Sequence, residues 1–340
     1  MNFIHKTYTL AKILANFKRR KTTLDTMPIK LWIESSLICN LKCVMCPNKD
    51  LAAEKKGKMS FELFKKIIDE AKDFVNDVYL HHRGEPLTNK DLFKMIIYAK
   101  NRGIAVRFHT NAGLLSLDKS ELLIEAAPNL VSISFDGFTK DVYEKVRRGG
   151  NFETTVANIK ELLKRKKQLR EALPYIVIER IHFKDESMNV DTAETRALEQ
   201  EFRDLGVNEI ITKQEYDWAV ESNKGGEILN GNVCTFPWYA MVICWDGTVT
   251  PCPQDFMACM NLGNVSKSSI KEIWNGAAYT TLRRNLAGNV NELSLCKKCD
   301  RLCRKQIGGI PFQYAITFLA DQYLGYGALR KLVGTSERNG

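Results

Sequence analysis

The sequence predicts an α/β protein built on a parallel sheet. Across roughly residues 30–215, short apolar runs alternate with segments whose apolar residues recur at helical spacing. Consecutive strand–helix units imply parallel strands joined by right-handed crossovers. The chain has 340 residues, of which 44% are hydrophobic and 26% charged, so it can bury a large core. Both an open doubly wound sheet and an incomplete barrel fit this pattern, and either places chemistry at the carboxyl ends of the strands.

Six strands and five helices are expected from these runs. Ser60 is expected to be the N-cap of the first helix, and Asp118 and Glu121 have capping-box spacing in the third. The strands are predicted at Lys30–Ser35, Val78–His82, Ile104–Thr110, Leu130–Phe135, Tyr175–Ile181 and Glu209–Thr212. The helices are predicted at Ser60–Phe74, Leu92–Asn101, Asp118–Ala126, Phe152–Glu171 and 191–205.

The N-terminal segment is strongly basic. Residues 1–30 contain seven Lys or Arg and one acidic residue, and so carry +6 of the net charge of +10. Apolar residues recur there at helical spacing, which predicts a basic amphipathic helix over residues 1–29. Packing on the main domain is the first interpretation, and peripheral contact of residues 1–25 with an anionic membrane surface is the second. The rest of the chain is nearly balanced in charge and shows no recognised nucleic-acid-binding module, which argues against a nucleic-acid partner.

The composition also bears on location and redox chemistry. No apolar run approaches the ~20 residues that span a bilayer, and the N-terminus lacks the apolar core of a signal peptide. A cytoplasmic protein is therefore expected, with any peripheral contact at the inner membrane face. Ten cysteines in such a protein are better explained as metal ligands or reactive thiols than as disulfides.

Three cysteines directly follow the first predicted strand. Cys39, Cys43 and Cys46 are separated by three and then two residues. Three thiolates can hold three irons of a [4Fe–4S] cube and leave the fourth iron open, whereas a cluster that only carries electrons normally has four cysteine ligands. A structural zinc site is the alternative, although its pairs usually belong to a four-ligand set.

This spacing resembles the signature of the radical S-adenosylmethionine (radical SAM) superfamily. The resemblance implies that residues 30–220 form a partial (β/α)6 TIM-like barrel and that SAM fills the open iron position. Arg83-Gly84-Glu85-Pro86 resembles the Gly-Gly-Glu motif that binds the SAM amino group, with Arg83 in place of the first glycine. Gly84 and Glu85 are therefore expected in the cofactor site; a simple turn is the alternative.

Further strand-end residues continue the resemblance. Thr110-Asn111-Ala112-Gly113 is similar to the family's Thr-Asn-Gly stretch, which makes Asn111 a candidate. Ser134 and Asp136 resemble the pair that faces the ribose or carboxylate of SAM, although Asp136 could instead cap a helix.

Arg180 and Met45 are the remaining candidates for contact with SAM. Arg180 could bind the SAM carboxylate through its planar fork or form a structural ion pair. Met45 stands where the family often has an aromatic residue against the adenine, and its thioether is also polarisable.

A cysteine-rich segment follows over residues 225–310. Asp246-Gly247 predicts a hairpin turn there. The layout resembles the SPASM or twitch auxiliary domains of radical SAM enzymes, including Leu262-Gly263-Asn264-Val265 and Trp274. The resemblance implies one auxiliary [4Fe–4S] cluster, with zinc as the alternative. Its four ligands would be Cys234, Cys252, Cys296 and Cys299.

Three cysteines are left over, and the chain closes with an apolar tail. Cys244, Cys259 and Cys303 are either inert thiols or candidate donors of a hydrogen atom to a substrate radical. Cys303 could also replace one of the four ligands. Residues 311–340 are expected to form a helical tail.

The resemblance implies reductive cleavage of SAM to a 5′-deoxyadenosyl radical, which takes a hydrogen atom from a carbohydrate-like or other polar small molecule. An external one-electron donor such as flavodoxin or ferredoxin would supply the electron. The cysteine layout is similar to that of aminoglycoside-pathway alcohol dehydrogenases, which favours oxidation with the auxiliary cluster as electron acceptor. A peptide- or protein-modifying maturase and a redox-neutral epimerase with a cysteine hydrogen donor are the alternatives. A non-enzymatic electron carrier is less consistent with Glu85, because a carrier needs no ligand for SAM.

Overall fold

The computed structural model describes residues 3–215, 232–303, 306–307 and 310–311. The chain divides into two compact units. The barrel unit consists of Ile33–Lys65 and Val78–Tyr216, and the four-cysteine unit of Met1–Trp32, Lys66–Asp77 and Asp217–Gly340. The N-terminal segment is therefore grouped with the C-terminal cysteine-rich segment.

The barrel unit is built on parallel strands in sequential order. Strand β3 (Ala105–Thr110) pairs with β4 (Leu130–Ser134), which pairs with β5 (Tyr175–His182), which pairs with β6 (Glu209–Gln214). The order continues from β3 to β2 (Asp77–Tyr79) and β1 (Lys30–Ile33). Among the described residues, β6 does not pair with β1, so the sheet stays open. The predicted partial barrel of six strands is confirmed.

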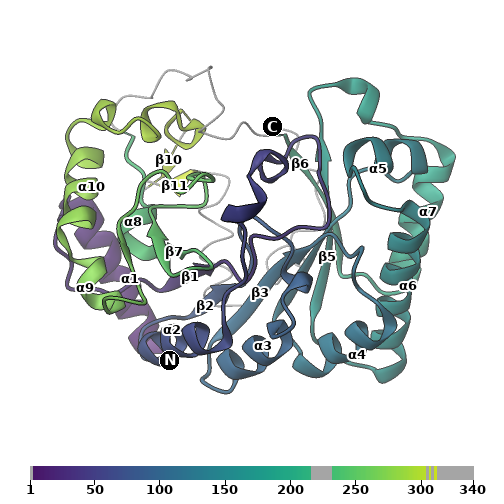
Figure 1. The fold of residues 1–340 in the computed structure, drawn as a ribbon, viewed down its shortest axis with the longest axis horizontal. Coiled ribbons are helices and arrows are strands. Elements are labelled where there is room, and N and C mark those ends of the chain that lie inside the picture. Colours follow the sequence, from purple (N-terminus) through teal and green to yellow (C-terminus); the bar gives the residue numbers. More distant parts are fainter. Residues whose placement is uncertain (1–2, 216–231, 304–305, 308–309, 312–340) are drawn as a thin grey trace. The chain divides into compact units, whose positions relative to one another are not determined.

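Helices cover one face of these strands (Figure 1). The side chains that β3, β4 and β5 turn toward this layer are apolar and fully buried, among them Phe108, Ile133 and Ile178. The described helices of this region are α2 (Phe61–Ala71), α3 (Leu92–Lys100), α4 (Leu117–Ala126), α5 (Lys140–Val146), α6 (Phe152–Leu169) and α7 (Ala193–Asp204). Short 3-10 turns lie at η1 (Pro47–Asp50), η2 (Ala53–Lys55), η3 (Pro86–Thr88) and η4 (Glu186–Met188).

The predicted helix starts were partly right. Ser60 Oγ accepts a hydrogen bond from Leu63 N at 3.2 Å, which confirms the N-cap. Helix α4 begins at Leu117 after Ser116, so the predicted capping box of Asp118 and Glu121 is wrong. Both acidic residues lie inside the helix there. Helix α5 was not predicted, because seven residues are too few for a clear periodicity.

Successive side chains on a strand point to opposite faces, so the residues between the buried apolar ones face away from the helices. Those residues are largely polar. His109 pairs in register with Ser132, and Ser134 with Glu179. The inner face of the barrel unit is thus polar toward the carboxyl ends of its strands.

The four-cysteine unit contains a small antiparallel meander. The predicted hairpin is confirmed: Gly247, with φ of +87°, turns the chain between β7 and β8. The strands are β7 (Ala240–Ile243), β8 (Thr248–Thr250), β9 (Gly263–Asn264), β10 (Gln306–Ile307) and β11 (Ile310–Pro311). The helices and turns are α1 (Phe3–Lys18), α8 (Phe236–Tyr239), α9 (Ile270–Trp274), α10 (Ala277–Ala287), η5 (Val290–Glu292), η6 (Cys296–Lys298) and η7 (Asp300–Leu302).

Helix α1 packs within this unit through one side. The Phe17 ring meets Trp238 edge-on, with 5.4 Å between centroids, and the Trp238 indole N–H donates to the Lys21 carbonyl at 3.0 Å. The buried Arg283 donates to the carbonyls of Thr22 and Pro237, both at 2.9 Å. These contacts lie within the four-cysteine unit, whereas the first interpretation was packing on the main domain.

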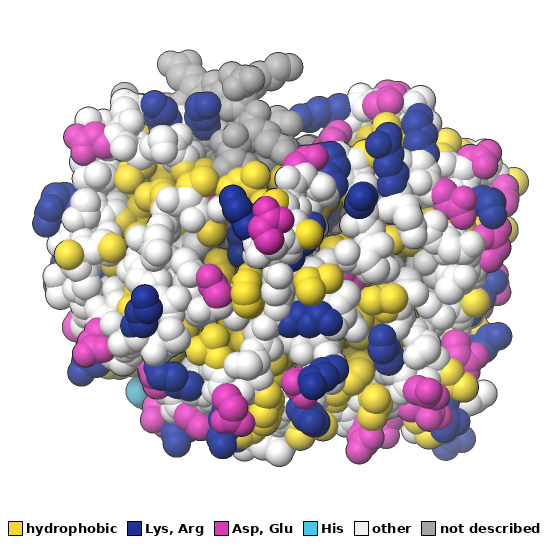
Figure 2. All heavy atoms as spheres, in the orientation of Figure 1, with side chains coloured by type: hydrophobic (Ala, Val, Ile, Leu, Met, Phe, Trp, Pro, Cys, Tyr) yellow, Lys and Arg dark blue, Asp and Glu magenta, His cyan; other side chains and the backbone are white. Residues whose placement is uncertain are grey.

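The other side of α1 is exposed, with large apolar side chains at Phe3, Ile4, Tyr8 and Leu14. In the described part of the chain, no helix combines the length and apolarity needed to cross a bilayer. On the face drawn in Figure 2, the described Lys and Arg side chains are interspersed with Asp and Glu. The predicted helical tail over residues 311–340 lies outside the described residues, apart from Pro311.

Candidate functional site

The three-cysteine loop follows β1 and is held by backbone hydrogen bonds. Lys42 N donates to the Arg148 carbonyl at 2.8 Å, and Val44 N to the Val146 carbonyl at 3.0 Å. These bonds attach the loop to the end of α5. The thiols of the loop are close enough to interact: burial, with contributions from Glu85, Cys43 and Cys46, raises the pKa of Cys39 to about 12.

Two donors point at sulfur atoms of this loop. Leu41 N donates to Cys39 Sγ at 3.4 Å, and Arg147 Nη1 to Cys43 Sγ at 3.6 Å. Donors of this kind stabilise thiolates, which is the form that binds iron. Burial lowers the pKa of Arg147, but the Asp136 and Cys43 charges outweigh it and the net shift is upward. Arg147 was not predicted, because nothing in its local sequence marks it.

Asp136 lies next to Arg147 rather than at a helix start. One carboxylate oxygen forms a buried ion pair with Arg147, and the other accepts from Ile181 N at 2.6 Å. The residue therefore links the end of β4 to β5, and the helix-cap alternative is not what the structure shows. Ser134 ends β4 and is half-buried, on the inner face opposite Glu179.

Glu85 is buried and accepts three hydrogen bonds. The donors are Leu87 N at 3.0 Å, Thr110 Oγ1 at 2.7 Å and Asn111 N at 2.8 Å. Burial raises its pKa, and these bonds oppose the rise. Since a carboxylate has about four acceptor sites, one remains for an amino group. Glu85 thus positions the Thr110–Gly113 stretch while keeping capacity for a ligand.

Gly84 is required by backbone packing. A Cβ atom there would lie 2.4 Å from the Ser36 carbonyl oxygen and 2.7 Å from that of Ile38. Glu85 N donates to the same Ile38 carbonyl at 2.9 Å. The motif therefore lies directly against the backbone that leads into Cys39.

Arg83 makes a buried bidentate pair with Glu34. The Nε–Oε1 and Nη2–Oε2 distances are both 2.7 Å. Glu34 follows β1, so the pair joins the ends of two neighbouring strands. The arginine at the first position of the motif is thus accommodated by a carboxylate from the strand before the cysteine loop.

Two asparagines complete the network. Asn111 Nδ2 donates to Asn40 Oδ1 at 2.9 Å, within the cysteine loop. Asn48 Nδ2 donates to the carbonyls of Leu37 at 2.9 Å and Arg83 at 2.8 Å. Asn48 was not predicted, and only its position shortly after the third cysteine could have suggested it.

Two predicted cofactor residues make other contacts. Met45 packs against the apolar cluster of Val142, Val146 and Phe183. Arg180 pairs with Glu199 of α7 and donates to Thr212 Oγ1 at 2.8 Å. The structure does not bring Arg180 to the cysteine loop, because it points to the opposite face of β5 from Glu179.

The second set of cysteines lies in the four-cysteine unit. Burial raises the pKa of Cys299 to about 12, and Cys234 adds to the rise. The pKa of Cys296 is raised by burial and by the other three members, Cys252, Cys234 and Cys299. The four thiols are therefore close enough to influence one another electrostatically. The Arg301 guanidinium acts in the opposite direction on Cys234 and Cys252.

The other cysteines of this unit have different surroundings. Cys244 is buried at the end of β7, where its N–H donates to the Thr248 carbonyl at 2.8 Å. Cys259 is exposed. Cys303 Sγ lies 3.8 Å from the Cys299 carbonyl, beside the set of four.

Both donor sets have the chemistry of an iron–sulfur site. In the described residues, no three His, Cys, Asp or Glu side chains are gathered closely enough to hold one metal ion. Thiolates are the ligands that [4Fe–4S] clusters take, and each set consists of cysteines alone. The residues present therefore fit such clusters.

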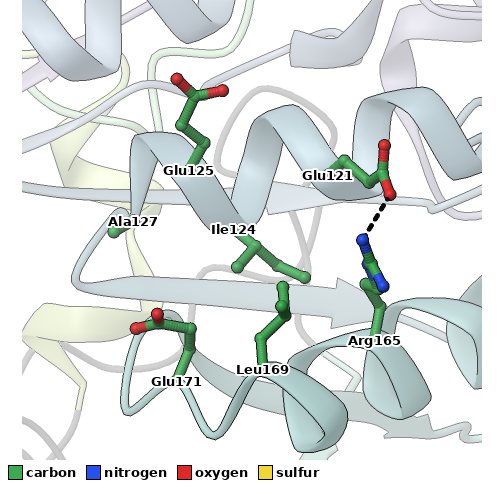
Figure 3. A pocket seen from close by; sticks show the side chains of 7 residues that line it. All are labelled: Glu121, Ile124, Glu125, Ala127, Arg165, Leu169 and Glu171. Atoms are coloured by element: carbon green, nitrogen blue, oxygen red, sulfur yellow. Dashed lines mark ion pairs between the residues drawn. The ribbon is translucent and has the colours of Figure 1, made fainter.

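A surface pocket between α4 and α6 has no such chemistry. Its lining includes the Glu121–Arg165 ion pair at 3.0 Å together with Ile124 and Leu169 (Figure 3). Ala127 and Glu171, which also line it, follow the ends of the two helices, near the amino ends of the next strands. The pocket is therefore at the opposite end of the strands from the cysteine loop.

Comparisons with known proteins agree with both sites. The model of the radical SAM superfamily matches residues 33–178, and that of the SPASM iron–sulfur cluster-binding domain matches residues 234–300. The tungsten-containing aldehyde ferredoxin oxidoreductase cofactor-modifying protein of Pyrococcus furiosus is 26% identical over 318 residues, covering 79% of this chain and 88% of that protein. The S-adenosyl-L-methionine-dependent 2-deoxy-scyllo-inosamine dehydrogenase of Niallia circulans is 22% identical over 291 residues, covering 82% and 95%.

The fold has relatives among solved structures. BtrN in complex with AdoMet and 2-DOIA superposes with a TM-score of 0.54 at 19% identity, covering 82% of this chain and 94% of that one. Together the two family models cover more than half of the chain. The chain belongs to the radical SAM superfamily, as an enzyme with a C-terminal SPASM domain.

Proposed function

We propose that this enzyme oxidises an alcohol of a polar, carbohydrate-like small molecule to a carbonyl, with the auxiliary cluster as electron acceptor. The observation that carries the proposal is a set of four thiols, in which the charges of Cys234, Cys252 and Cys299 act on Cys296. Four thiolates would ligate every iron of a cluster and leave no site for substrate, so the cluster would transfer electrons. The similarity to a 2-deoxy-scyllo-inosamine dehydrogenase supports the same reaction class.

The residues of the barrel unit have defined tasks in this proposal. Cys39, Cys43 and Cys46 would hold the SAM-binding cluster, and Glu85 would accept a hydrogen bond from the SAM amino group. Gly84 and Asn111 fix the strand ends that carry this site. Ser134 and Asp136 would face the ribose or carboxylate of SAM. When bound, SAM and its cluster supply the 5′-deoxyadenosyl radical that removes a hydrogen atom from the substrate.

Anaerobic reconstitution tests the proposal. We expect about eight irons per chain, from two four-iron clusters, and 5′-deoxyadenosine formation with SAM and a reductant such as reduced flavodoxin or ferredoxin. A substrate deuterated at the reacting carbon, beginning with 2-deoxy-scyllo-inosamine and related cyclitols, should transfer deuterium to 5′-deoxyadenosine and yield a carbonyl. Deuterium transfer without net oxidation would instead indicate an epimerase, with Cys244, Cys259 or Cys303 as the hydrogen donor to be tested by Cys→Ser variants. Deuterium transfer from peptides alone would indicate a maturase.

A second candidate substrate is an organic cofactor. The relative from Pyrococcus furiosus is named as a cofactor-modifying protein and is similar along most of both chains. The same deuterium assay with a polar organic cofactor in place of the cyclitol distinguishes the two substrate classes.

Contact with a membrane surface stays a separate prediction. The exposed apolar side of α1 carries Phe3, Ile4 and Tyr8. Co-sedimentation with anionic liposomes, compared between the full chain and a chain lacking residues 1–25, tests it. Equal recovery of both chains in the supernatant would contradict it.

A further inference from the structure

The inner face of the barrel unit carries a cluster of ionisable side chains that the proposed cofactor site does not use. His81 follows β2, His109 is on β3, Glu179 on β5 and Lys213 on β6. His109 Nδ1 lies 3.6 Å from Glu179 Oε2, and Lys213 Nζ lies 2.7 Å from the same oxygen. The carboxyl ends of these strands thus bring together two imidazoles, a carboxylate and an ammonium.

The imidazole rings of His81 and His109 lie against each other, so that both are not protonated at once. Their rings stack with centroids 4.0 Å apart and planes inclined by 28°. Two cations in that arrangement would repel, so at most one ring is protonated at a time. Glu179 faces His109, whereas the charged groups that act on His81 are His109, His82 and Lys213. Among the described residues, Nδ1 of His81 is buried without a hydrogen-bond partner.

The surroundings keep His109 neutral. Burial lowers its pKa, Glu179 raises it and Lys213 lowers it, and the net shift is downward. Glu179 remains ionised, because the charge of Lys213 and the hydrogen bonds from Lys213 and Ser132 oppose the effect of burial, and the net shift of the Glu179 pKa is downward. About 30% of the His109 side chain is exposed, against 12% for Glu179, so the imidazole can be reached from the barrel interior.

We propose that His109, oriented by Glu179, is the base that removes the hydroxyl proton during substrate oxidation. This inference rests on the proposed alcohol oxidation. Glu179 faces Nδ1 and favours its protonation, which leaves Nε2 with a free lone pair for the substrate. At 3.6 Å the carboxylate acts on this tautomer through its charge rather than through a hydrogen bond. His81 and Lys213 are positioning residues, because they act through His109 and Glu179.

The step balances in atoms and electrons. The C–H bond of the carbinol carbon would break, and its hydrogen atom would go to the radical that bound SAM supplies. The O–H bond would then break, with its proton going to Nε2 of His109 and one electron to the auxiliary cluster. The C–O single bond would become a C=O double bond. Loss of the hydrogen atom makes the hydroxyl more acidic than that of the parent alcohol, so a neutral imidazole is a sufficient base.

The first test compares His109→Gln with His182→Gln. His182 also lies near a glutamate, with Nε2 3.5 Å from Glu186 Oε1, but it points to the opposite face of β5 from Glu179 and is 43% exposed. His109→Gln should lower carbonyl formation by about 10²-fold or more, a typical contribution of a general base. Deuterium should still reach 5′-deoxyadenosine in both variants, and His182→Gln should form the carbonyl as wild type does. An unchanged carbonyl yield in His109→Gln would overturn the inference. Absence of deuterium transfer in the wild type would instead refute the proposed function.

The second test needs no turnover. Nitrogen NMR of histidine-labelled enzyme should show His109 protonated at Nδ1 with a pKa below 6.5. Glu179→Gln should lower this pKa further, whereas Lys213→Met should raise it. A neutral His109 protonated at Nε2, or a pKa that neither substitution moves, would contradict the assignment even if the catalytic variants folded poorly.

Discussion

The two cysteine sets of this enzyme are built differently. The three-cysteine loop is embedded in polar contacts, with Arg147 on Cys43, Asn111 on Asn40 and Glu85 on the adjacent strand end. The four-cysteine set lies beside an apolar cluster that includes Phe236, Ala240 and Val242, to which Cys234 and Cys252 belong. Its charged neighbours are Arg301, Asp255, which acts on Cys296, and Asp300, which acts on Cys299.

The difference follows from what each site has to do. A cluster with an open iron needs donors and acceptors around it to hold and orient a second ligand. A cluster with four ligands needs only shielding from water, and burial there sets its properties. Under the proposed function, the polar network surrounds the reactive site and the apolar cluster adjoins the electron-transfer site.

The strongest test removes one ligand from each set. Cys43→Ser should abolish 5′-deoxyadenosine formation and lower the iron content from about eight to about four per chain. Cys296→Ser should lose a similar amount of iron yet still cleave SAM, because its cluster acts after the radical. Iron analysis measures the cluster content of each variant, and chromatography of 5′-deoxyadenosine measures its SAM cleavage. Loss of SAM cleavage in both variants, with folding intact, would remove the functional distinction between the sites.

The polar network is next tested through its buried ion pair. Arg83→Met leaves the Glu34 carboxylate buried without its partner, which should lower the free energy of unfolding by about 3–5 kcal/mol. The double variant with Glu34→Leu should recover most of this loss, since both charges are then gone. Denaturant unfolding measures the change. A double variant as unstable as Arg83→Met would show that the pair is not the cause.

The two arginines beside the cysteine sets should tune the two clusters separately. Removing a positive charge destabilises the reduced, more negative state, so Arg147→Gln should lower the potential of the SAM-binding cluster and Arg301→Gln that of the auxiliary cluster. A shift of about 60 mV corresponds to a tenfold change in the equilibrium for one electron, and we expect shifts of that order. Redox titration followed by electron paramagnetic resonance resolves the reduction potentials of the two clusters. The pairing of arginines and clusters would be contradicted if Arg147→Gln shifted the potential of the auxiliary cluster, or if Arg301→Gln shifted that of the SAM-binding cluster.

The smallest effect is expected at the exposed side of α1. Phe3→Ser and Ile4→Ser should change the free energy of unfolding by less than about 0.5 kcal/mol, because both side chains are mostly exposed. Phe17→Ala should cost about 3–5 kcal/mol, since its ring is buried against Trp238. Thermal unfolding compares the stability of these three variants with that of the wild type. Equal losses would mean that both sides of α1 are packed.

Features that depend on neighbouring residues could be predicted from the sequence. The strands, the hairpin at Gly247 and both cysteine sets are of this kind, because the alternation of apolar and polar residues, the turn residues and the ligand spacing each involve only a few neighbouring positions. Arg147, Asn48 and the Arg83–Glu34 pair could not, since each depends on a partner that only the fold brings near. The same limit explains Arg180: its partner on α7 could not be known from the residue alone. The inner-face histidines were missed because single histidines on separate strands form no motif.

The close approach of Gly84 to Ser36 and Ile38 also limits how this site can evolve. The first motif position accepts an arginine, because its side chain finds room and a counter-charge at Glu34. The second position has no room for a methyl group, since the two strand ends touch through their backbones. Variation in related enzymes should therefore be wide at position 83 and nearly absent at position 84. A long side chain fits at position 83, whereas at position 84 the space does not admit even one added carbon atom.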